Sequence, residues 1–475
     1  MSKIHGMMDV GKRSMMNSQT ALQTTGHNIA NKSTEGYSRQ RVELQTAEPI
    51  GLGNQRIGMG SKTAAVTRTN NSYLEKQIGK EQSSLGYYNG KSDAMNRVEQ
   101  VYNEQANKGL NTFVTDFFNS FREFANNPES LAGRTQVKET AEFLTSDFKR
   151  VNNQLNEIRR DLDTQVSSNV DSVNQLTKEI AQLNDKIQLV TNQGGPGNDE
   201  RDRRDLLIKQ LGEKINIRWA EGEGGAVTVT AGNTAVLVAG SDAKTLEVRS
   251  TPGDGKKLEG SVSIFYKNNE TSEPFDATKQ FTGGAIGGLL DVRDNTITDL
   301  LDNVDKMAYS IATTVNEVHS RGFDAYNRQG NNFFDMPMEV RGASMGLKVN
   351  DAISRDPMRI AGARHANAPG DNTVANAIGQ LQFEQVMPDK KTTVDEFYNS
   401  MVGEVGIQSR KAHLSQESQK GIVDNLKNIR ESISGVSLDE ETTKLIEFQK
   451  AFDASARLIK TADEMFDTVL NLKRM

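Results

Sequence analysis

The C-terminal segment 437–475 carries one unbroken stripe of apolar or small side chains. They recur at alternating steps of three and four, at Leu445, Phe448, Phe452, Ser455, Ile459, Ala462, Phe466 and Val469. This heptad pattern is typical of a helix that packs along a single seam. Ser437 and Glu440 have the spacing of a capping box, and neither Pro nor Gly follows them. The segment predicts one helix of about 35 residues, roughly 50 Å long at ~1.5 Å per residue.

The opposite end of the chain carries a stripe of the same period. Its positions are Ile4, Met8, Gly11, Met15, Ser18, Leu22, Thr25 and Ile29. Because a single seam needs a partner, we expect the two ends to pair as a two-stranded coiled coil. The two terminal helices would then form a stem, and the residues between them would form a body attached to that stem.

The N-terminal helix is weakly stabilised by its own residues. Residues 14–31 contain no Lys, Arg, Asp or Glu, and their Thr, Asn, Ser and Gly residues are mediocre helix formers. We expect this segment to be disordered in the monomer and to become helical when neighbouring copies cover its uncharged outer face. The alternative is an ordinary amphipathic helix docked on its own protein.

Composition restricts the classes of function. A chain of 475 residues exceeds the size of one core, so several domains are expected. With 35% hydrophobic and 6% aromatic residues and a mean hydropathy of -0.61, elongated helices with thin cores are favoured. The net charge is -6, and no basic cluster with interleaved aromatics is found. Nucleic acid and acidic membrane surfaces are therefore not expected as partners.

No motif for catalysis or for a cofactor is present. The chain has no cysteine, which excludes disulfides, thiol catalysis and cysteine metal sites. The five histidines are scattered, and no phosphate loop, nucleophile elbow or paired-carboxylate motif occurs. No stretch approaches the ~18 apolar residues of a membrane span, and the N-terminus lacks the apolar region of a secretory signal. We expect no enzyme, no cofactor, no metal, no membrane insertion and no cleaved signal peptide.

Changes of period divide the chain into seven segments. A period of two, punctuated by Gly224-Gly225, Gly232-Asn233 and a turn at 252–255, predicts an inserted antiparallel β domain at the far end of a helical body. The fold class is mainly α with this small β lobe. The expected segments are 1–70 (N-terminal coiled-coil helix and extended linker), 71–218, 284–324 and 374–436 (helical body), 219–283 (β domain), 325–373 (loop-rich segment or small appendage) and 437–475 (C-terminal coiled-coil helix).

Two terminal motifs resemble those of the flagellar axial proteins, the family of rod, hook and hook-associated proteins. The first, TGHNIANKSTEGYSRQRV, leaves a helix through a glycine turn into an extended run. The resemblance rests there on Asn28, Asn31, Thr34, Gly36 and Tyr37, while Glu35 replaces the usual Pro. The second is the C-terminal FQKAFDASARLIKTADEMFDTVLNL.

Two internal segments resemble one branch of that family, the FlgK hook-associated proteins. They are the Gly-Gly-Leu-Leu-Asp-x-Arg-Asp run that contains Asp291 and Arg293, and Asn316 followed by His319. From their chemistry we expect Asp291, Arg293 and Asp294 to pin a helix to the sheet. His319 has no partner at metal-ligand spacing, so we expect a polar contact at a helix end.

The resemblance implies a structural subunit of the bacterial flagellum that forms the hook-filament junction outside the cell, exported unfolded by the type III apparatus. It also implies as partners copies of the chain in a ring, the hook protein, the next hook-associated junction protein, and an export chaperone on the C-terminal helix. The expected assembly interface is Ile4, Met8, Met15, Leu22, Ile29, Leu445, Phe448, Phe452, Ile459, Phe466 and Val469. The alternatives are another rod or hook protein, and a secreted coiled-coil translocator or adhesin.

Overall fold

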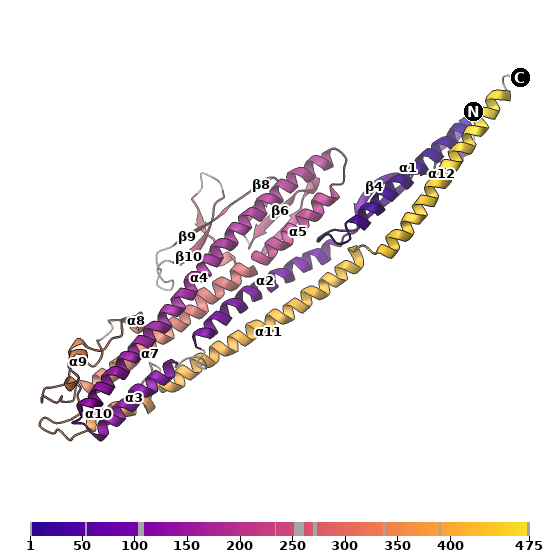
Figure 1. Ribbon diagram of the computed structural model, residues 1–475. Coiled ribbons are helices and arrows are strands. Elements are labelled where there is room, and N and C mark those ends of the chain that lie inside the picture. Colours follow the sequence, from indigo (N-terminus) through magenta and orange to yellow (C-terminus); the bar gives the residue numbers. More distant parts are fainter. Residues whose placement is uncertain are drawn as a thin grey trace.

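The computed structural model describes residues 2–52, 55–102, 109–232, 234–250, 261–268, 273–335, 338–388 and 391–472. Figure 1 shows an elongated molecule in which a stem, a helical body and a loop-rich end follow one another. The stem is built from the two ends of the chain. The predicted fold class is confirmed, because most elements are helices and the sheets are small and antiparallel.

The stem consists of α1 (Ser2–Ala30) and α12 (Leu438–Leu472), which lie side by side with both termini at the tip (Figure 1). Their backbones approach closely, since a Cβ added to Gly11 would lie 2.7 Å from the Ile459 side chain. The hydroxyl groups of Ser14 and Ser455 share a hydrogen bond of 2.7 Å across the pair. The two ends therefore pack along each other, while the supercoil of a coiled coil stays a prediction.

A β-hairpin accompanies the stem where the sequence predicts only an extended linker. Strands β1 (Gln40–Thr46) and β4 (Ser61–Arg68) pair antiparallel, and β2 (Ile50–Leu52) pairs with β3 (Gln55–Ile57). The hairpin packs on α1, because the Asn17 amide donates to the Ser61 carbonyl at 2.9 Å. Strands this rich in charged and polar residues lack the alternating pattern that would reveal their pairing.

The body is a bundle of long helices around one apolar core. Its main members are α2 (Ser72–Val101), α3 (Leu110–Asn126), α4 (Leu131–Asn192), α7 (Thr298–His319) and α11 (Val394–Ser434). Helix α4 runs unbroken for 62 residues. Helix α2 ends at Val101, and residues 103–108 lie outside the described residues.

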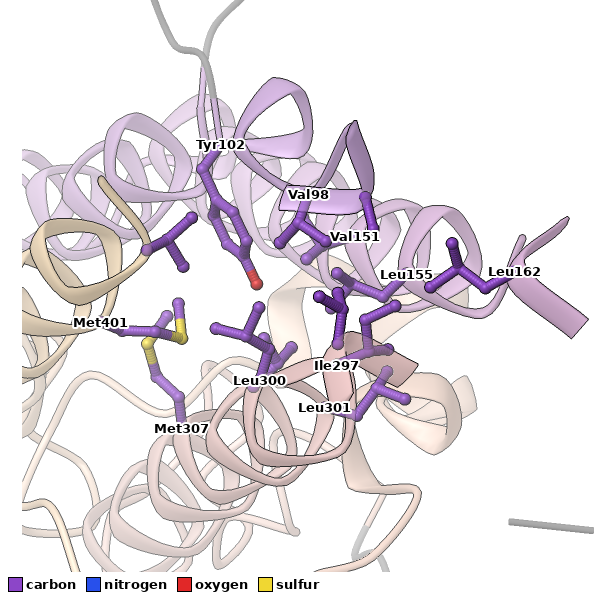
Figure 2. Packing of buried hydrophobic residues seen from close by; sticks show 14 of the residues in the cluster. Val98, Tyr102, Val151, Leu155, Leu162, Ile297, Leu300, Leu301, Met307 and Met401 are labelled. Carbon is purple, nitrogen blue, oxygen red and sulfur yellow. The ribbon is translucent and has the colours of Figure 1, made fainter. Parts of the chain in front are cut away.

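Side chains from four of these helices meet in the core. Figure 2 shows those of α2, α4, α7 and α11 pointing toward one another. The phenylalanines of α3 are also buried, and Phe117 packs against Phe333 and Phe334 of the loop-rich end. The labelled residues of Figure 2 are Val98, Tyr102, Val151, Leu155, Leu162, Ile297, Leu300, Leu301, Met307 and Met401.

Two shorter helices complete the body. Helix α5 (Asn198–Lys214) follows α4 through a glycine turn, and α6 (Gly284–Asp291) continues through the π-helical turn η3 (Val292–Ile297) into α7. Glycines let α6 approach α2, because a Cβ on Gly288 would collide with the backbone carbonyl of Tyr87. The close packing of α6 on α2 therefore explains why the Gly-Gly-Leu-Leu-Asp segment has glycine at position 288.

The inserted β region lies along the flank of α4. One sheet has the order β5 (Ile217–Glu221), β6 (Val227–Ala231), β7 (Ala235–Ala239), β8 (Asp242–Ala243), with η1 (Glu223–Gly225) between β5 and β6. The other has β9 (Leu246–Ser250), β10 (Val262–Tyr266) and β11 (Phe275–Asp276), followed by η2 (Thr278–Gln280).

The expectation of a β lobe at the far end is wrong. The Asn184 and Asn174 amides of α4 donate to the Val227 and Leu246 carbonyls at 2.8 Å each, which fixes both sheets to the side of the helix (Figure 1). Buried valines of β6 also belong to the core of the body. Asn233 and the turn at 252–255 lie outside the described residues.

The loop-rich end closes the body opposite the stem (Figure 1). It contains α8 (Ala343–Gly346), α9 (Asp351–Arg355), η4 (Pro357–Arg359), α10 (Thr373–Gln380) and η5 (Leu381–Phe383). Short helices and loops are what the Asn, Gly and Pro content of 325–373 predicts. Whether this segment is a separate domain, and the other segment boundaries, stay predictions.

Candidate functional site

The stem meets the body at a cluster of buried polar side chains that we call the joint: Asn28, Arg39, Gln40, Glu75, Asp202, Arg430 and Glu441. Here α1 turns into β1, and α11 passes into α12 at Gly435 (Figure 1). The joint therefore gathers segments from both ends of the chain and from the body. The hydrogen bonds and ion pairs of these side chains fix the orientation of the stem relative to the body.

Asn28 is the centre of the joint and is 1% exposed. Its Nδ2 donates to the Gln40 carbonyl and to Glu441 Oε2, at 2.9 Å each. Its Oδ1 accepts from the Tyr37 hydroxyl at 2.7 Å and from the Gln40 amide at 3.0 Å. Both donors and both acceptor positions of the carboxamide are thus used, a combination that only an amide side chain offers.

Glu441 in the first turn of α12 is also 1% exposed, and charge neutralises it. Arg39 Nε donates to Glu441 Oε1 at 2.8 Å, and Nη2 of the same guanidinium lies 2.8 Å from that oxygen as an ion pair. The second carboxylate oxygen takes the Asn28 hydrogen bond. Neither residue was predictable from the sequence, because an acid in a first helical turn and an arginine in a strand are each ordinary by themselves.

The glycine turn is held by Arg430 of α11. Gly36 has φ +83, and the carbonyls of Gly36 and Tyr37 accept from Arg430 Nη2 at 3.1 Å each. The same guanidinium binds Glu75 of α2 at 3.0 Å, and Lys209 binds the other Glu75 oxygen at 2.6 Å. Burial alone would raise the pKa of Glu75, but these two cations outweigh it and hold the pKa below its ordinary value.

Tyr37 connects the turn to α1, and Asp202 connects the extended run that follows to α5. Burial, with the nearby carboxylates, raises the pKa of Tyr37 far above its ordinary value, so the hydroxyl stays a donor to Asn28. Asp202 accepts from the Ser38 amide at 2.9 Å and from Arg68 at 2.7 Å. Burial raises the pKa of Asp202 despite the Arg68 charge. Ser38, just before β1, and Arg68, at the end of β4, are therefore both tied to α5 of the body.

Asn31 and Thr34 shape the helix exit without entering the joint. The Asn31 amide donates to the His27 carbonyl at 3.1 Å, and Thr34 donates to Asn31 at 3.2 Å. Thr34 is exposed. Of the five N-terminal motif residues, the structure brings Asn28, Gly36 and Tyr37 to the joint.

The stem seam is only partly covered within one chain. The large predicted interface residues of both helices are half-buried, except that Val469 is 38% exposed. The fully buried positions of α1 carry small or polar side chains, at Gly11, Asn17, Ser18, Ala21, Thr25 and Asn28. Small residues let α12 and the hairpin approach α1 closely. Three of these positions, Gly11, Ser18 and Thr25, belong to the predicted stripe, and the other three lie beside it. The half-buried interface residues are Ile4, Met8, Met15, Leu22, Ile29, Leu445, Phe448, Phe452, Ile459 and Phe466.

The outer face of α1 is exposed and uncharged. Met16, Gln19, Gln23, Gly26 and Ala30 recur at steps of three and four, and all five are exposed. The Met16 side chain, the one large apolar group on this face, is 57% exposed. An exposed helix face without charge is unusual for a soluble helix, because charged residues normally occupy it.

Arg293 and Asp291 fix η3 and α6 to different neighbours. The fully buried Arg293 donates to Asp163 of α4 at 2.6 Å and to the Val262 carbonyl of β10 at 2.7 Å, so it joins helix to sheet as expected. The expectation for Asp291 is wrong. It binds Tyr87 at 2.8 Å and Lys91 at 2.6 Å on α2, because α6 packs on that helix rather than on the sheet.

Asn316 and His319 anchor the loop-rich end to α7. Asn316 exchanges two hydrogen bonds with the Phe334 backbone, at 2.8 and 2.9 Å. His319 is the last residue of α7 and is fully buried. Its Nδ1 donates to the Asn331 carbonyl at 2.6 Å, and its Nε2 accepts from the Ala361 amide at 2.9 Å. Burial lowers the pKa of His319 to about 4, so the ring is a neutral structural contact.

Within the described ranges, no group of three or more His, Cys, Asp or Glu side chains is arranged to hold a metal ion. A cavity of about 570 Å³ lies between α2, α5 and β5, beside Trp219. Its carboxylates, Glu75 and Asp205, are already paired with Lys209, Arg430 and Arg68. None of the described helices is long and apolar enough to cross a bilayer.

Comparison with known proteins places this architecture in a family. Residues 95–334, just over half of the chain, match the model of the flagellar hook-associated protein FlgK helical domain. The chain belongs to the FlgK family. Residues 431–472 also match the C-terminal model of the flagellar basal body rod FlgEFG proteins. A FlgK-family chain is a structural component of the flagellum. The two matches cover the part of the body from the end of α2 to residue 334, and α12 of the stem.

Relatives of this FlgK-family chain are similar over nearly their full length. Flagellar hook-associated protein 1 of Bacillus subtilis is 28% identical over 496 residues, covering 98% of this chain and 97% of the relative. The protein of the same name from Salmonella typhimurium is 24% identical, with 96% and 97% covered. The solved structure of the flagellar hook junction protein FlgK from Burkholderia pseudomallei superposes with a TM-score of 0.68 at 15% identity, covering 76% of this chain and 100% of that one. It shows that the fold is shared.

Proposed function

We propose that this chain is a structural subunit of the hook-filament junction that self-assembles through its terminal helices. The observation that carries the proposal is the stem. Its seam is half-covered within one chain, and the outer face of α1 from Met16 to Ala30 is exposed and free of charge. A surface of this kind gains burial when further helices pack around it.

The names of the relatives support the same location, the junction between hook and filament. The Bacillus and Salmonella relatives are called hook-associated proteins, and the Burkholderia structure is described as a hook junction protein. The FlgK-specific segments around Asp291 and His319 both have structural contacts in this chain. These features favour the junction over the rod or the hook shaft.

The partners follow from the assembly. Copies of the chain form a ring, whose two faces meet the hook protein and the next hook-associated junction protein. The subunit acts outside the cell. An export chaperone binds α12 before assembly, since that helix has an apolar seam and no partner until α1 is in place.

Ordering of the stem is coupled to assembly. Small residues such as Gly11 and Ala21 occupy the buried positions of α1, so one chain buries little apolar area there. The joint supplies hydrogen bonds rather than apolar contact. The stem is therefore disordered in the free monomer and becomes rigid among neighbouring copies. Amide exchange that is slow throughout α1 and α12 in a dilute monomer would contradict this coupling.

The test adds charge to the outer face of α1. Gln19→Glu with Gln23→Glu keeps size and helix propensity, and both side chains are exposed on the uncharged face. In a strain that lacks the wild-type protein, this variant is expected to be exported but absent from isolated hooks, and swimming should fall at least tenfold. The matched control, Gln182→Glu with Gln188→Glu, places the same charges at exposed positions of α4 in the body.

Two outcomes decide between the candidate functions. Wild-type swimming by the outer-face variant would contradict assembly through α1. Purified wild-type chain that fails to bind isolated hook ends would remove the junction assignment and favour the translocator or adhesin alternative.

A further inference from the structure

Two buried arginines line one hollow beside α4, and they differ in their partners. The hollow has a volume of about 450 Å³ and is lined by side chains of α4, α6, η2 and η3. Nη1 of Arg293 donates to Asp163 of α4 at 2.6 Å and to the Val262 carbonyl at 2.7 Å. Nε and Nη2 of the same side chain donate to Asp294 at 2.8 and 3.0 Å. Arg159 of α4 is the second arginine, and it is 8% exposed.

Arg159 has no ion-pair partner within the part of the chain that the structure describes. Its Nε and Nη1 are covered by protein and have no hydrogen-bond partner there. Asp163, one turn further along α4, is engaged by Arg293 instead. Burial lowers the pKa of Arg159, and three neighbouring arginines add to the shift that Asp163 opposes. Because arginine keeps its proton in proteins, the cost of this buried charge falls only when an anion approaches it.

The other charged groups of the lining also favour an anion. Lys279 of η2 lines the hollow, is exposed, and forms no ion pair with any described residue. The two carboxylates of the lining, Asp291 and Asp294, are already paired with cations at 2.6 and 2.8 Å. Two cations, Arg159 and Lys279, therefore remain without a counter-charge in the described lining. Together they match the charge of a dianion, and arginine binds the oxygens of phosphate and sulfate through charge-assisted hydrogen bonds.

We propose that this hollow is a binding site for a small oxyanion of the phosphate or sulfate type, with Arg159 and Lys279 as its two cationic contacts. Because Nε and Nη1 are covered, the oxyanion meets Arg159 through Nη2. The hollow has room for the ion together with several waters, each of about 30 Å³. The bound ion joins α4 to η2 and so strengthens the attachment of the β region to the body. The site goes beyond the proposed assembly and does not depend on it.

Titration of inorganic phosphate into the purified full chain tests the site. Isothermal titration calorimetry in a chloride buffer at pH 7 is expected to show saturable binding to the wild-type chain. Arg159→Met keeps the aliphatic stem but removes the charge, so it should weaken binding about tenfold or more. Lys279→Gln changes an exposed side chain and should weaken binding about threefold. The matched control Arg160→Met removes the same charge from the next residue, which is exposed, and should change binding by less than about twofold.

Thermal unfolding separates a specific site from a general effect of salt. Phosphate stabilises many folded proteins because it is excluded from their surface, so each chain is compared in phosphate and in chloride of equal ionic strength. In chloride, Arg159→Met should unfold at the wild-type temperature or above it, since it removes a buried charge that lacks a partner. In phosphate, the wild-type chain should gain more than Arg159→Met, because only the folded wild-type chain binds the ion.

Three results would overturn the oxyanion site. They are a wild-type chain that binds no phosphate, an equal phosphate affinity of the wild-type and Arg159→Met chains, and an equal thermal gain of both chains in phosphate. Each of them would leave the proposed assembly through the terminal helices standing, because export and incorporation into hooks are measured separately. Lys279→Gln keeps the affinity test available if Arg159→Met folds poorly, and an unchanged affinity of the Lys279→Gln chain would remove Lys279 from the site.

Discussion

Asn28 and Glu441 lie 413 positions apart and share a hydrogen bond of 2.9 Å from the Asn28 amide to the Glu441 carboxylate. The contact ties the first helix to the last at the point where both leave the body. Neither side chain is accessible, and the remaining groups of each are satisfied by Gln40, Tyr37 and Arg39. The joint therefore sets the orientation of the stem through specific partners rather than through apolar area.

Asn28→Asp is expected to disable the joint. The new carboxylate cannot donate, so the Gln40 carbonyl and Glu441 both lose the hydrogen bond from Asn28. Two buried carboxylates then face each other and repel. Swimming in a strain that lacks the wild-type protein should fall at least tenfold, with less protein in isolated hooks. Asn31→Asp changes a helix-end contact only and serves as the control.

A second substitution separates repulsion from misfolding. Glu441→Gln in the Asn28→Asp background returns a donor to the shared position, so part of the lost swimming should come back. If the double variant swims no better than Asn28→Asp alone, the Asn28–Glu441 contact is not what the first substitution broke.

Gly288→Ala should destabilise the body. The added methyl group meets the Tyr87 carbonyl on α2, and two packed helix backbones cannot separate cheaply. We expect a loss of about 2–4 kcal/mol in the free energy of unfolding. Urea unfolding followed by circular dichroism measures it. Gly406→Ala in α11 has open space around it and should instead be neutral or stabilise by up to ~1 kcal/mol.

His319 should make the loop-rich end sensitive to acid. Burial lowers its pKa to about 4 in the folded chain, against an ordinary value of 6.5. Because the pKa of His319 is lower in the folded chain, the unfolded chain binds the proton at a higher pH. The stability that the neutral ring contributes is therefore complete above pH 6.5 and is lost as the pH falls toward 4. The loss amounts to about 3 kcal/mol at most, from ~1.36 kcal/mol per pKa unit.

Unfolding free energies at pH 7 and pH 4.5 test the His319 effect. The wild-type chain should lose more stability between these values than His319→Gln, whose side chain does not titrate. Asp371, with a pKa lowered to about 2, acts only below pH 3.8 and does not confuse the comparison. Equal slopes for both chains would show that protonation of His319 is not coupled to folding.

The long helices were predictable from the sequence because their information is local. The apolar stripes of α4, α7 and α12 each repeat over several turns. The period therefore stays recognisable even if one position of the stripe is not apolar. The aromatic run of α3 indicates a core helix for the same reason. The β region is also evident from its period of two.

The joint and the placement of the β region were not predictable, since they depend on pairs far apart in the chain. Nothing near Glu441 indicates Arg39 as its partner, and nothing near Arg430 indicates the carbonyls of Gly36 and Tyr37. The β lobe was misplaced because Asn174 and Asn184, which fix it, look like surface residues in a heptad stripe. Buried amides in a helix were the signal that was available.

Phe452→Asp and Leu22→Asp should each abolish incorporation while the body stays folded. Both side chains are half-buried in the stem, so a charge there loses apolar contact and is desolvated when neighbouring copies close around it. Far-ultraviolet circular dichroism and the unfolding transition of the body should stay near those of the wild-type chain, whereas isolated hooks should lack the variant protein. Thr461→Asp adds the same charge at an exposed position of α12 and should leave swimming intact. Retained motility in the Phe452→Asp strain would refute assembly through the stem.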